Sequence, residues 1–430
     1  MRLPAKLPSP NLKLPSGLGR RQNGEVVGLD IQPGFVAAVR ARVNGSIVAE
    51  RAAALDLPAD TMRDGEVLDE AALADTLREL FGQAGLPKRV RVGVANQRTV
   101  LRTLELPPLT DQKELAAAVN FQAQDQVPMP LNNAVLDFHP LGIIDTPAGP
   151  RQRVVLVAAQ RDMVERLLSA VRAAGLTPEG VDLSAFALIR SLYRHEPDQQ
   201  GRVLYLNVDG LANLAIAEGT VCRFTRVVGS GLEGMATELA ERRGIALVDA
   251  RARLADVDLT QPIPVEQPLA SEPEPEPAPA PEPEPTAEQQ PEETLSPGEA
   301  EAREREMSYE EQLAALNQAP EPEPEPGPEL PAAASEADVW MVVENGVREI
   351  SGEVRNSLDF HRSQDGGEVS HVVLSGAAQD IPGFAEALQS SLGVEVRTAD
   401  IGVAEGGLGG SVSPHRLAVA VGLAAAEAPQ

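Results

Sequence analysis

Two stretches of the chain decide its fold, and the first is Val27-Gly28-Leu29-Asp30-Ile31. This apolar run carries a carboxylate, Asp30, near its end, and Gln32-Pro33-Gly34 follow it, which predicts a strand and a tight turn. The second stretch, Leu206-Asn207-Val208-Asp209-Gly210, repeats the order of apolar strand, carboxylate and glycine. Carboxylates at two such turns can position Mg²⁺, and glycine amides can approach a phosphate closely. The two turns together therefore predict a candidate site.

The same order of elements surrounds each stretch. Three strands and a helix are predicted first at residues 26–31, 35–42, 47–55 and 68–81. They are predicted again at residues 202–208, 214–218, 221–228 and 232–243. Such a repeat indicates a duplicated α/β lobe.

Other strands and helices are predicted between and after the two repeats. Between them lie strands at 90–95, 99–106, 135–138 and 154–159 and helices at 111–126 and 161–174. After them come a strand at 369–375 and helices at 338–360, 383–392 and 414–425. Strands alternate with helices to the end of the chain, which is typical of an α/β fold.

The acidity of the chain belongs mainly to one segment. The 430 residues carry a net charge of −27, which disfavours binding to nucleic acid. Residues 266–336 contain 20 acidic residues, 2 arginines and 16 of the 37 prolines, so this segment alone carries −18 (2 − 20). An alternating Glu-Pro chain cannot bury enough apolar area to fold. We therefore predict that residues 266–336 form a disordered linker.

Several classes of protein and site are disfavoured by the residues present. The single cysteine, Cys222, excludes an intrachain disulfide and fits a reducing compartment. The five histidines have no metal-binding spacing, no phosphate-binding P-loop is present, and we predict no catalytic residues. No apolar stretch approaches the roughly 18 to 20 residues that cross a bilayer. Residues 1–24 are basic and proline-containing, and we predict a disordered tail with at most weak attraction to an anionic membrane surface.

In their order along the chain, these motifs resemble the actin-like ATPase superfamily. The closer resemblance is to the PilM family of type IV pilus assembly proteins, which is related to FtsA. The stretches that carry it lie at residues 27–31, 101–109, 120–128, 173–182, 226–231, 349–360, 374–376 and 418–424. The resemblance implies a two-lobed actin-like fold, a duplicated RNase H-like α/β fold with a nucleotide cleft between the lobes.

The resemblance also implies a division of the chain. Residues 25–84 and 183–200 are expected to form lobe 1, with an inserted subdomain at 85–182. Residues 201–265 and 337–427 are expected to form lobe 2, which the acidic linker interrupts. In the family, the protein lies at the cytoplasmic face of the inner membrane, grips the N-terminal tail of a PilN-like membrane protein and links it to the pilus assembly complex. The resemblance leaves open whether the chain forms a homo-oligomer.

The family's nucleotide loops imply a set of site residues. The nucleotide-binding positions are Asp30, Gly34, Asn207, Asp209, Gly210, Gly229, Gly231, Ser375 and Gly376, with Asp30 and Asp209 as metal ligands. The loops depart from the family pattern at Pro33, at Asn207 in place of an aspartate, and at Ala377 and Ala378 in place of glycines. An expected Glu-x-x-Lys reads Arg251-Ala252-Arg253-Leu254. ATP and Mg²⁺ are therefore expected to bind weakly if at all, and we predict a scaffold and not an enzyme.

Two alternatives to a scaffold stay open. An active Mg-ATP-binding ATPase or kinase of the superfamily would share the lobes but would need intact phosphate loops. An FtsA-like polymerising membrane tether would be expected to end in an amphipathic membrane helix. Residues 418–430 have no basic face, which argues against the tether.

Overall fold

The computed structural model describes residues 26–44, 46–195, 201–261, 336–365, 367–408 and 412–425. The predicted tail at 1–24 and the predicted linker at 266–336 lie outside these ranges, except for Glu336. Within the described ranges, no helix combines the length and the apolar character needed to cross a membrane.

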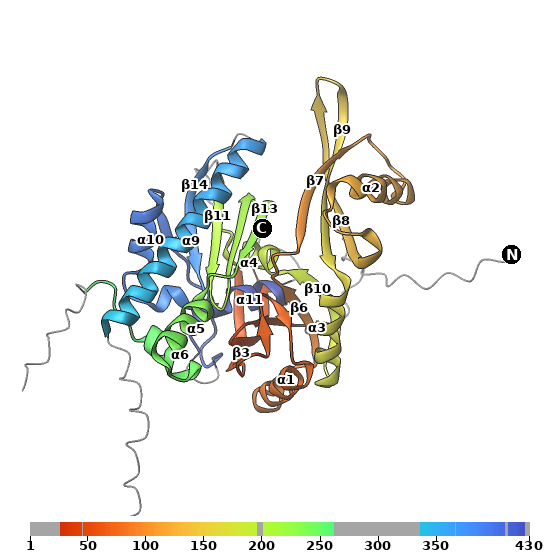
Figure 1. The fold of residues 1–430 in the computed structure, drawn as a ribbon. Coiled ribbons are helices and arrows are strands. Elements are labelled where there is room, and N and C mark those ends of the chain that lie inside the picture. The colour runs from red at the N-terminus through yellow and green to blue at the C-terminus, as the bar shows by residue number, and fades with distance from the viewer. Residues whose placement is uncertain are drawn as a thin grey trace, which may run out of the picture. The chain divides into compact units, whose positions relative to one another are not determined.

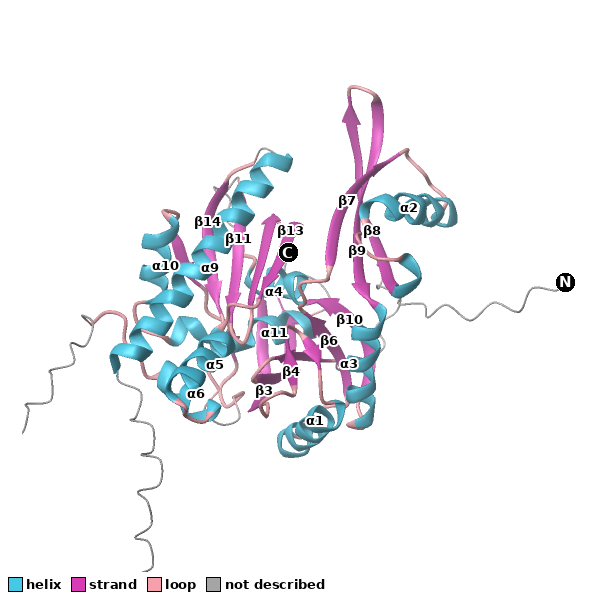
Figure 2. Cartoon of the chain, in the orientation of Figure 1, coloured by secondary structure: helices cyan, strands magenta, loops and turns pink. Residues whose placement is uncertain are grey.

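The described residues form two large sheets, a three-stranded sheet and a two-stranded ribbon (Figures 1 and 2). The first sheet has the order β10 (Thr177–Leu183), β6 (Arg89–Val94), β1 (Val27–Gln32), β2 (Phe35–Asn44), β3 (Ser46–Asp56) and β16 (Gly402–Val403). The second has the order β15 (Val396–Thr398), β14 (Val369–Ser375), β11 (Arg202–Val208), β12 (Ala212–Glu218) and β13 (Val221–Val228). A two-stranded ribbon joins β4 (Met62–Arg63) to β5 (Glu66–Val67).

The two large sheets have the same topology, which confirms the predicted duplication. In each, three antiparallel strands run in sequence, and the first of them also pairs in parallel with a later strand. A further parallel strand then continues each sheet. Because β1 and β11 are the central strands, both are buried along most of their length, and their apolar residues fit that position.

Helices cover both sheets and separate them. On the outer face of the first sheet, α1 (Glu70–Ala84) and α3 (Arg161–Ala173) close one core. Between the sheets lie α4 (Ser184–Leu192) and α11 (Ala418–Ala424), which share a second core with residues of both sheets. The outer face of the second sheet carries α5 (Leu232–Arg243), α6 (Leu247–Ala255), α9 (Glu336–Asp365) and α10 (Phe384–Leu392). Short 3₁₀ turns span Leu131–Asn133, Ala377–Asp380 and Pro414–Leu417.

The third sheet projects from the first lobe in Figure 1 and has its own core. It has the order β7 (Val100–Leu106), β9 (Gly149–Gln160) and β8 (Ala134–Thr146), with α2 (Gln112–Gln126) packed on one face. The β8 and β9 strands are much longer than predicted. The alternation of apolar and polar residues is weak toward the tip of this hairpin, because both faces are exposed there, as at Ile143.

Two predicted boundaries differ from the structure. The insertion predicted at 85–182 includes β6 and β10, which hydrogen-bond into the first sheet, and α3, which packs on α1. The separate sheet is therefore confined to residues 100–160. The closing helix is predicted within lobe 2, at 337–427. In the structure this helix, α11, packs on β1 and α4 between the sheets. Pairing and packing with distant elements decide these two assignments, and the local sequence pattern does not identify those partners.

Candidate functional site

The two predicted hairpin turns meet where the lobes approach each other. A Cβ atom on Gly210, in the β11–β12 turn, would lie 2.1 Å from the carbonyl oxygen of Pro33 in the β1–β2 turn. Only glycine therefore fits at position 210 without moving one turn away from the other. Gly34 has a φ of +78°, and a Cβ there would lie 2.4 Å from Oε2 of Glu233. Backbone and carboxylate atoms of this chain thus occupy the space directly around both glycines.

Asp30 lies buried at the end of β1, 1% exposed, where the Nε2 of Gln32 donates a 2.8 Å hydrogen bond to its Oδ2. Burial raises the pKa of Asp30 to about 7. The hydrogen bond from Gln32 and the charge of Arg416 oppose this rise, and the charge of Asp209 adds to it. The two carboxylates predicted as metal ligands are thus close enough to interact.

Asp209 is fully buried and is held by an arginine. The Nε of Arg416 donates a 2.9 Å hydrogen bond to Oδ1 of Asp209, and the amide of Ala377 donates a 3.4 Å bond to Oδ2. The same guanidinium lies 3.6 Å from the ring centroid of Phe35, so Arg416 joins the two lobes. Burial raises the pKa of Asp209, and the charge and hydrogen bond of Arg416 act against that rise.

The remaining site residues contact one another or the neighbouring backbone. Gly231 precedes α5, and the amide of Leu232 donates to the carbonyl of Asp209 at 2.7 Å. The first free amide of α5 is therefore used within the chain. A Cβ on Gly229 would meet Oδ1 of Asp64 at 3.3 Å.

The third loop, Ser375-Gly376-Ala377-Ala378 at the end of β14, packs directly on β11. Ser375 donates a 2.9 Å hydrogen bond from its hydroxyl to Oδ1 of Asn207, and both side chains are buried. Gly376 has a φ of +92°, and a Cβ there would lie 2.3 Å from the carbonyl oxygen of Val208. Asn207 thus accepts a hydrogen bond as a structural partner of the third loop.

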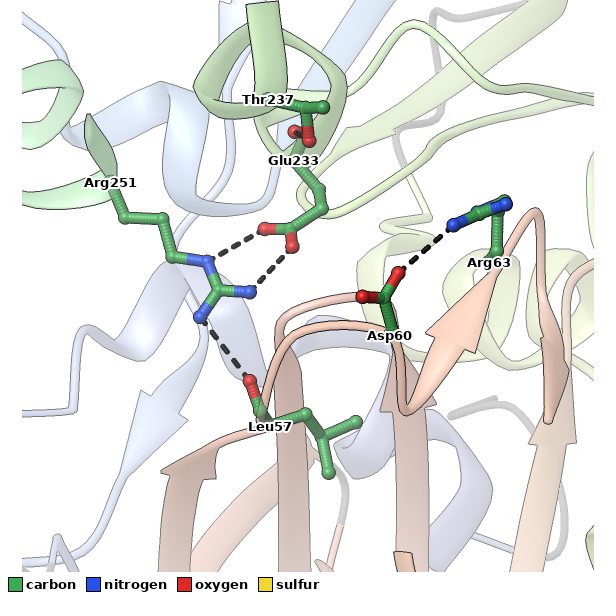
Figure 3. Close-up of polar contacts among 6 residues, drawn as sticks. All are labelled: Leu57, Asp60, Arg63, Glu233, Thr237 and Arg251. Carbon is green, nitrogen blue, oxygen red and sulfur yellow. Dashed lines mark hydrogen bonds and ion pairs between the residues drawn. The ribbon is translucent and has the colours of Figure 1, made fainter. Parts of the chain in front are cut away.

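A pair that the sequence did not single out joins the lobes beside Gly34 (Figure 3). Arg251 in α6 binds both carboxylate oxygens of Glu233 in α5, with the Nε to Oε2 distance at 2.8 Å. Its Nη1 also donates a 3.2 Å hydrogen bond to the carbonyl of Leu57, which follows β3 in the first lobe. In the sequence, Arg251 stands out only as a departure from Glu-x-x-Lys, and no local signal identifies Glu233 as its partner.

The residues fit Mg²⁺ and a nucleotide poorly in this arrangement. Among the described residues, no group of three or more His, Cys, Asp or Glu side chains has the geometry to hold a metal ion. Asp30 accepts from Gln32, Asp209 pairs with Arg416, and Pro33 covers Gly210. A phosphate or metal ion would have to displace these contacts.

We expect the buried Asp30 to make stability depend on pH. In the unfolded chain it ionises near pH 3.8, whereas in the folded chain its pKa is about 7. Between these values the folded state holds a proton that the unfolded state has lost, so the free energy of unfolding falls as pH rises. The Asp30→Asn variant should flatten this dependence in thermal melts and should melt above the parent at about pH 8. Asp60→Asn, at an exposed carboxylate, should keep the parent profile, and superimposable profiles for Asp30→Asn and the parent would contradict the expectation.

Comparison with known proteins relates part of the chain to a sequence family. The model of the type IV pilus assembly protein PilM matches residues 28–214. Residues 28–214 are therefore similar to the PilM family. This region runs from β1 through the three-stranded sheet, α4 and β11 to the first residues of β12.

Similarity to solved structures extends beyond residues 28–214. A PilM-PilN type IV pilus biogenesis complex is similar at 20% identity and a TM-score of 0.62, over 93% of this chain and 98% of the other. The ethanolamine utilization protein EutJ from Carboxydothermus hydrogenoformans is similar at 14% identity and 0.45, over 93% and 88%. MreB5 of Spiroplasma citri, bound to ADP, is similar at 10% identity and 0.42, over 92% and 94%. The first likeness and the duplicated sheets confirm the predicted two-lobed actin-like fold.

Proposed function

We propose that this chain is a scaffold protein of type IV pilus biogenesis that works at the cytoplasmic face of the inner membrane without an ATPase cycle. The PilM family match over residues 28–214 carries the proposal. A scaffold needs a stable body and a docking surface but no catalytic group. The contacts between the two hairpin turns and the Arg251 pair support such a body, because they join the lobes directly.

We expect Mg-ATP to bind weakly or not at all. Binding would require Arg416 to release Asp209 and Pro33 to move off Gly210, and each broken buried contact costs about 1–3 kcal/mol. Calorimetric titration of the full chain with Mg-ATP should therefore give no saturable heat at micromolar concentrations. Micromolar affinity or better would favour the alternative of an ATP-binding member of the superfamily.

The docking partner in this proposal is the N-terminal tail of a PilN-like inner-membrane protein. The similar solved complex pairs PilM with PilN. The three-stranded sheet offers an edge for an extended tail, because β7 is its outermost strand and pairs, among the described strands, with β9 alone. On the face of this sheet away from α2, Leu101 and Val155 are buried in the second core, whereas Thr103 on the same face is exposed.

Peptide binding tests this proposal directly. A labelled peptide that copies the tail of the PilN-like protein from the same genome should bind the full chain in fluorescence anisotropy. Thr103→Lys, on β7 in the face away from α2, should weaken binding by about tenfold or more, because a buried, unpaired charge opposes docking. Gln124→Lys on α2 is the matched control and should bind like the parent. Failure of the parent to bind would reject the docking role, and equal binding by both variants would reject this surface.

A further inference from the structure

A second site lies at the far end of the second lobe from the hairpin turns. A pocket of about 540 Å³ opens at the amino ends of β11 and β14. Asp209 and Ser375 lie at the opposite, carboxyl ends of these two strands. This volume lies in the range of small-molecule sites. Leu192, Val203 and Val373 contribute apolar wall. The pocket therefore shares no residue with the candidate site described above.

Arg194 lines the pocket just beyond the end of α4, and its guanidinium is fixed by the backbone. Its Nη1 donates to the carbonyls of Ser191 at 2.8 Å and Tyr193 at 3.0 Å, and its Nη2 donates to the carbonyl of Asp400 at 3.3 Å. Within the described part of the chain, Arg194 forms no ion pair. Carbonyl groups orient the guanidinium but do not neutralise its charge.

These bonds leave one edge of the guanidinium for a ligand. Three of the five N–H groups of Arg194 are used, and the Nε–H and the second Nη2–H remain. The nitrogens Nε and Nη2 share one edge of the planar guanidinium. That edge has the geometry that accepts both oxygens of a carboxylate.

The other charged groups of the pocket favour an anion. Two arginines, Arg194 and Arg397, line it together with one carboxylate, Asp400. Arg397 is paired with Glu395 through two hydrogen bonds of 2.9 Å, so its charge is already balanced. Arg194 is thus the lining cation whose charge a ligand would balance.

We propose that this pocket binds a small monocarboxylate with an apolar body. The carboxylate would bind the open edge of Arg194, and the hydrocarbon would lie against Leu192, Val203 and Val373. Because the site is separate from the hairpin turns and from the three-stranded sheet, this proposal does not depend on the proposed function.

Titration of the full chain with hexanoate, followed by NMR, tests the proposal. Saturable shifts are expected for the amides of Gly201, Gly219 and Ala399, which line the pocket. Hexanol and hexylamine have the same chain length without the carboxylate, and both should bind about tenfold more weakly, since they lack the charge-assisted pair.

Two variants of Arg194 distinguish the contribution of the guanidinium geometry from that of the positive charge. Arg194→Gln should reduce hexanoate binding by about tenfold, to the level of hexanol, and Arg194→Lys should keep part of the affinity because it keeps the charge but loses the fork. Arg172→Gln, at an exposed arginine of α3, is the control for a general loss of charge. Non-saturable shifts, equal binding of hexanol or hexylamine, or an Arg194→Gln variant that binds hexanoate like the parent would each overturn the proposal.

Discussion

Replacing Gly422 by alanine should prevent the two lobes from packing, because this glycine is the point where α11 crosses α4. A Cβ on Gly422 would lie 1.8 Å from the carbonyl oxygen of Ala187, and a backbone atom cannot move away as a flexible side chain can. The same helix crosses β1 at Gly28, where a Cβ would lie 1.9 Å from the carbonyl of Ala420. The variant should lose about 3 kcal/mol or more of unfolding free energy in urea titrations, or fail to fold.

A second helical glycine provides the control. Gly352 lies within α9, and a Cβ there would meet no atom within 4 Å. Gly352→Ala should therefore gain about 0.5–1 kcal/mol from helix propensity. A Gly422→Ala variant as stable as Gly352→Ala would show that α11 does not pack between the sheets as described.

Replacing Arg416 by methionine should cost about 3–5 kcal/mol at neutral pH, because it leaves the carboxylate of Asp209 buried without its partner. Burial already raises the pKa of Asp209, and loss of the guanidinium removes the main opposing influence. The raised pKa means that the folded state favours the protonated carboxyl, so the cost should shrink as pH falls. Urea titrations over a pH series measure both effects.

A double variant distinguishes the buried charge from lost packing. Asp209→Asn combined with Arg416→Met should recover most of the stability lost in Arg416→Met, because no charge is then left buried. Arg242→Met is the control, since Arg242 forms an exposed pair with Glu238, and it should change stability by about 0.5 kcal/mol or less. No recovery in the double variant would mean that Arg416 acts through its contact with Phe35 alone.

Elements with a local chemical signal were predictable from the sequence. The helix predicted at 111–126 matches α2, because Asp111 caps it by accepting from the amides of Lys113 and Glu114. The helix predicted at 161–174 matches α3, whose apolar residues recur on one face. The candidate turns were also located correctly, since carboxylate and glycine types mark them without any tertiary information.

Other elements lack such a signal for a physical reason. No helix was predicted at α4, because it lies between two sheets, is buried on nearly every side and has no polar face. The strand β10 contains a proline and a glycine, and its parallel pairing with β6 compensates for their poor strand propensity. Burial on both sides and pairing with distant strands hide these elements from a local pattern.

The sequence by itself determined the duplicated α/β lobes, the position of both hairpin turns and the resemblance to the PilM family. The tertiary structure decided what the carboxylates at those turns contact. Arg416 lies 207 residues after Asp209, and Glu233, Arg251 and Leu57 come from three separate elements or loops. Local spacing carries no information about such partners, because only the packing of α11 and α6 against the first lobe brings these side chains to the turns.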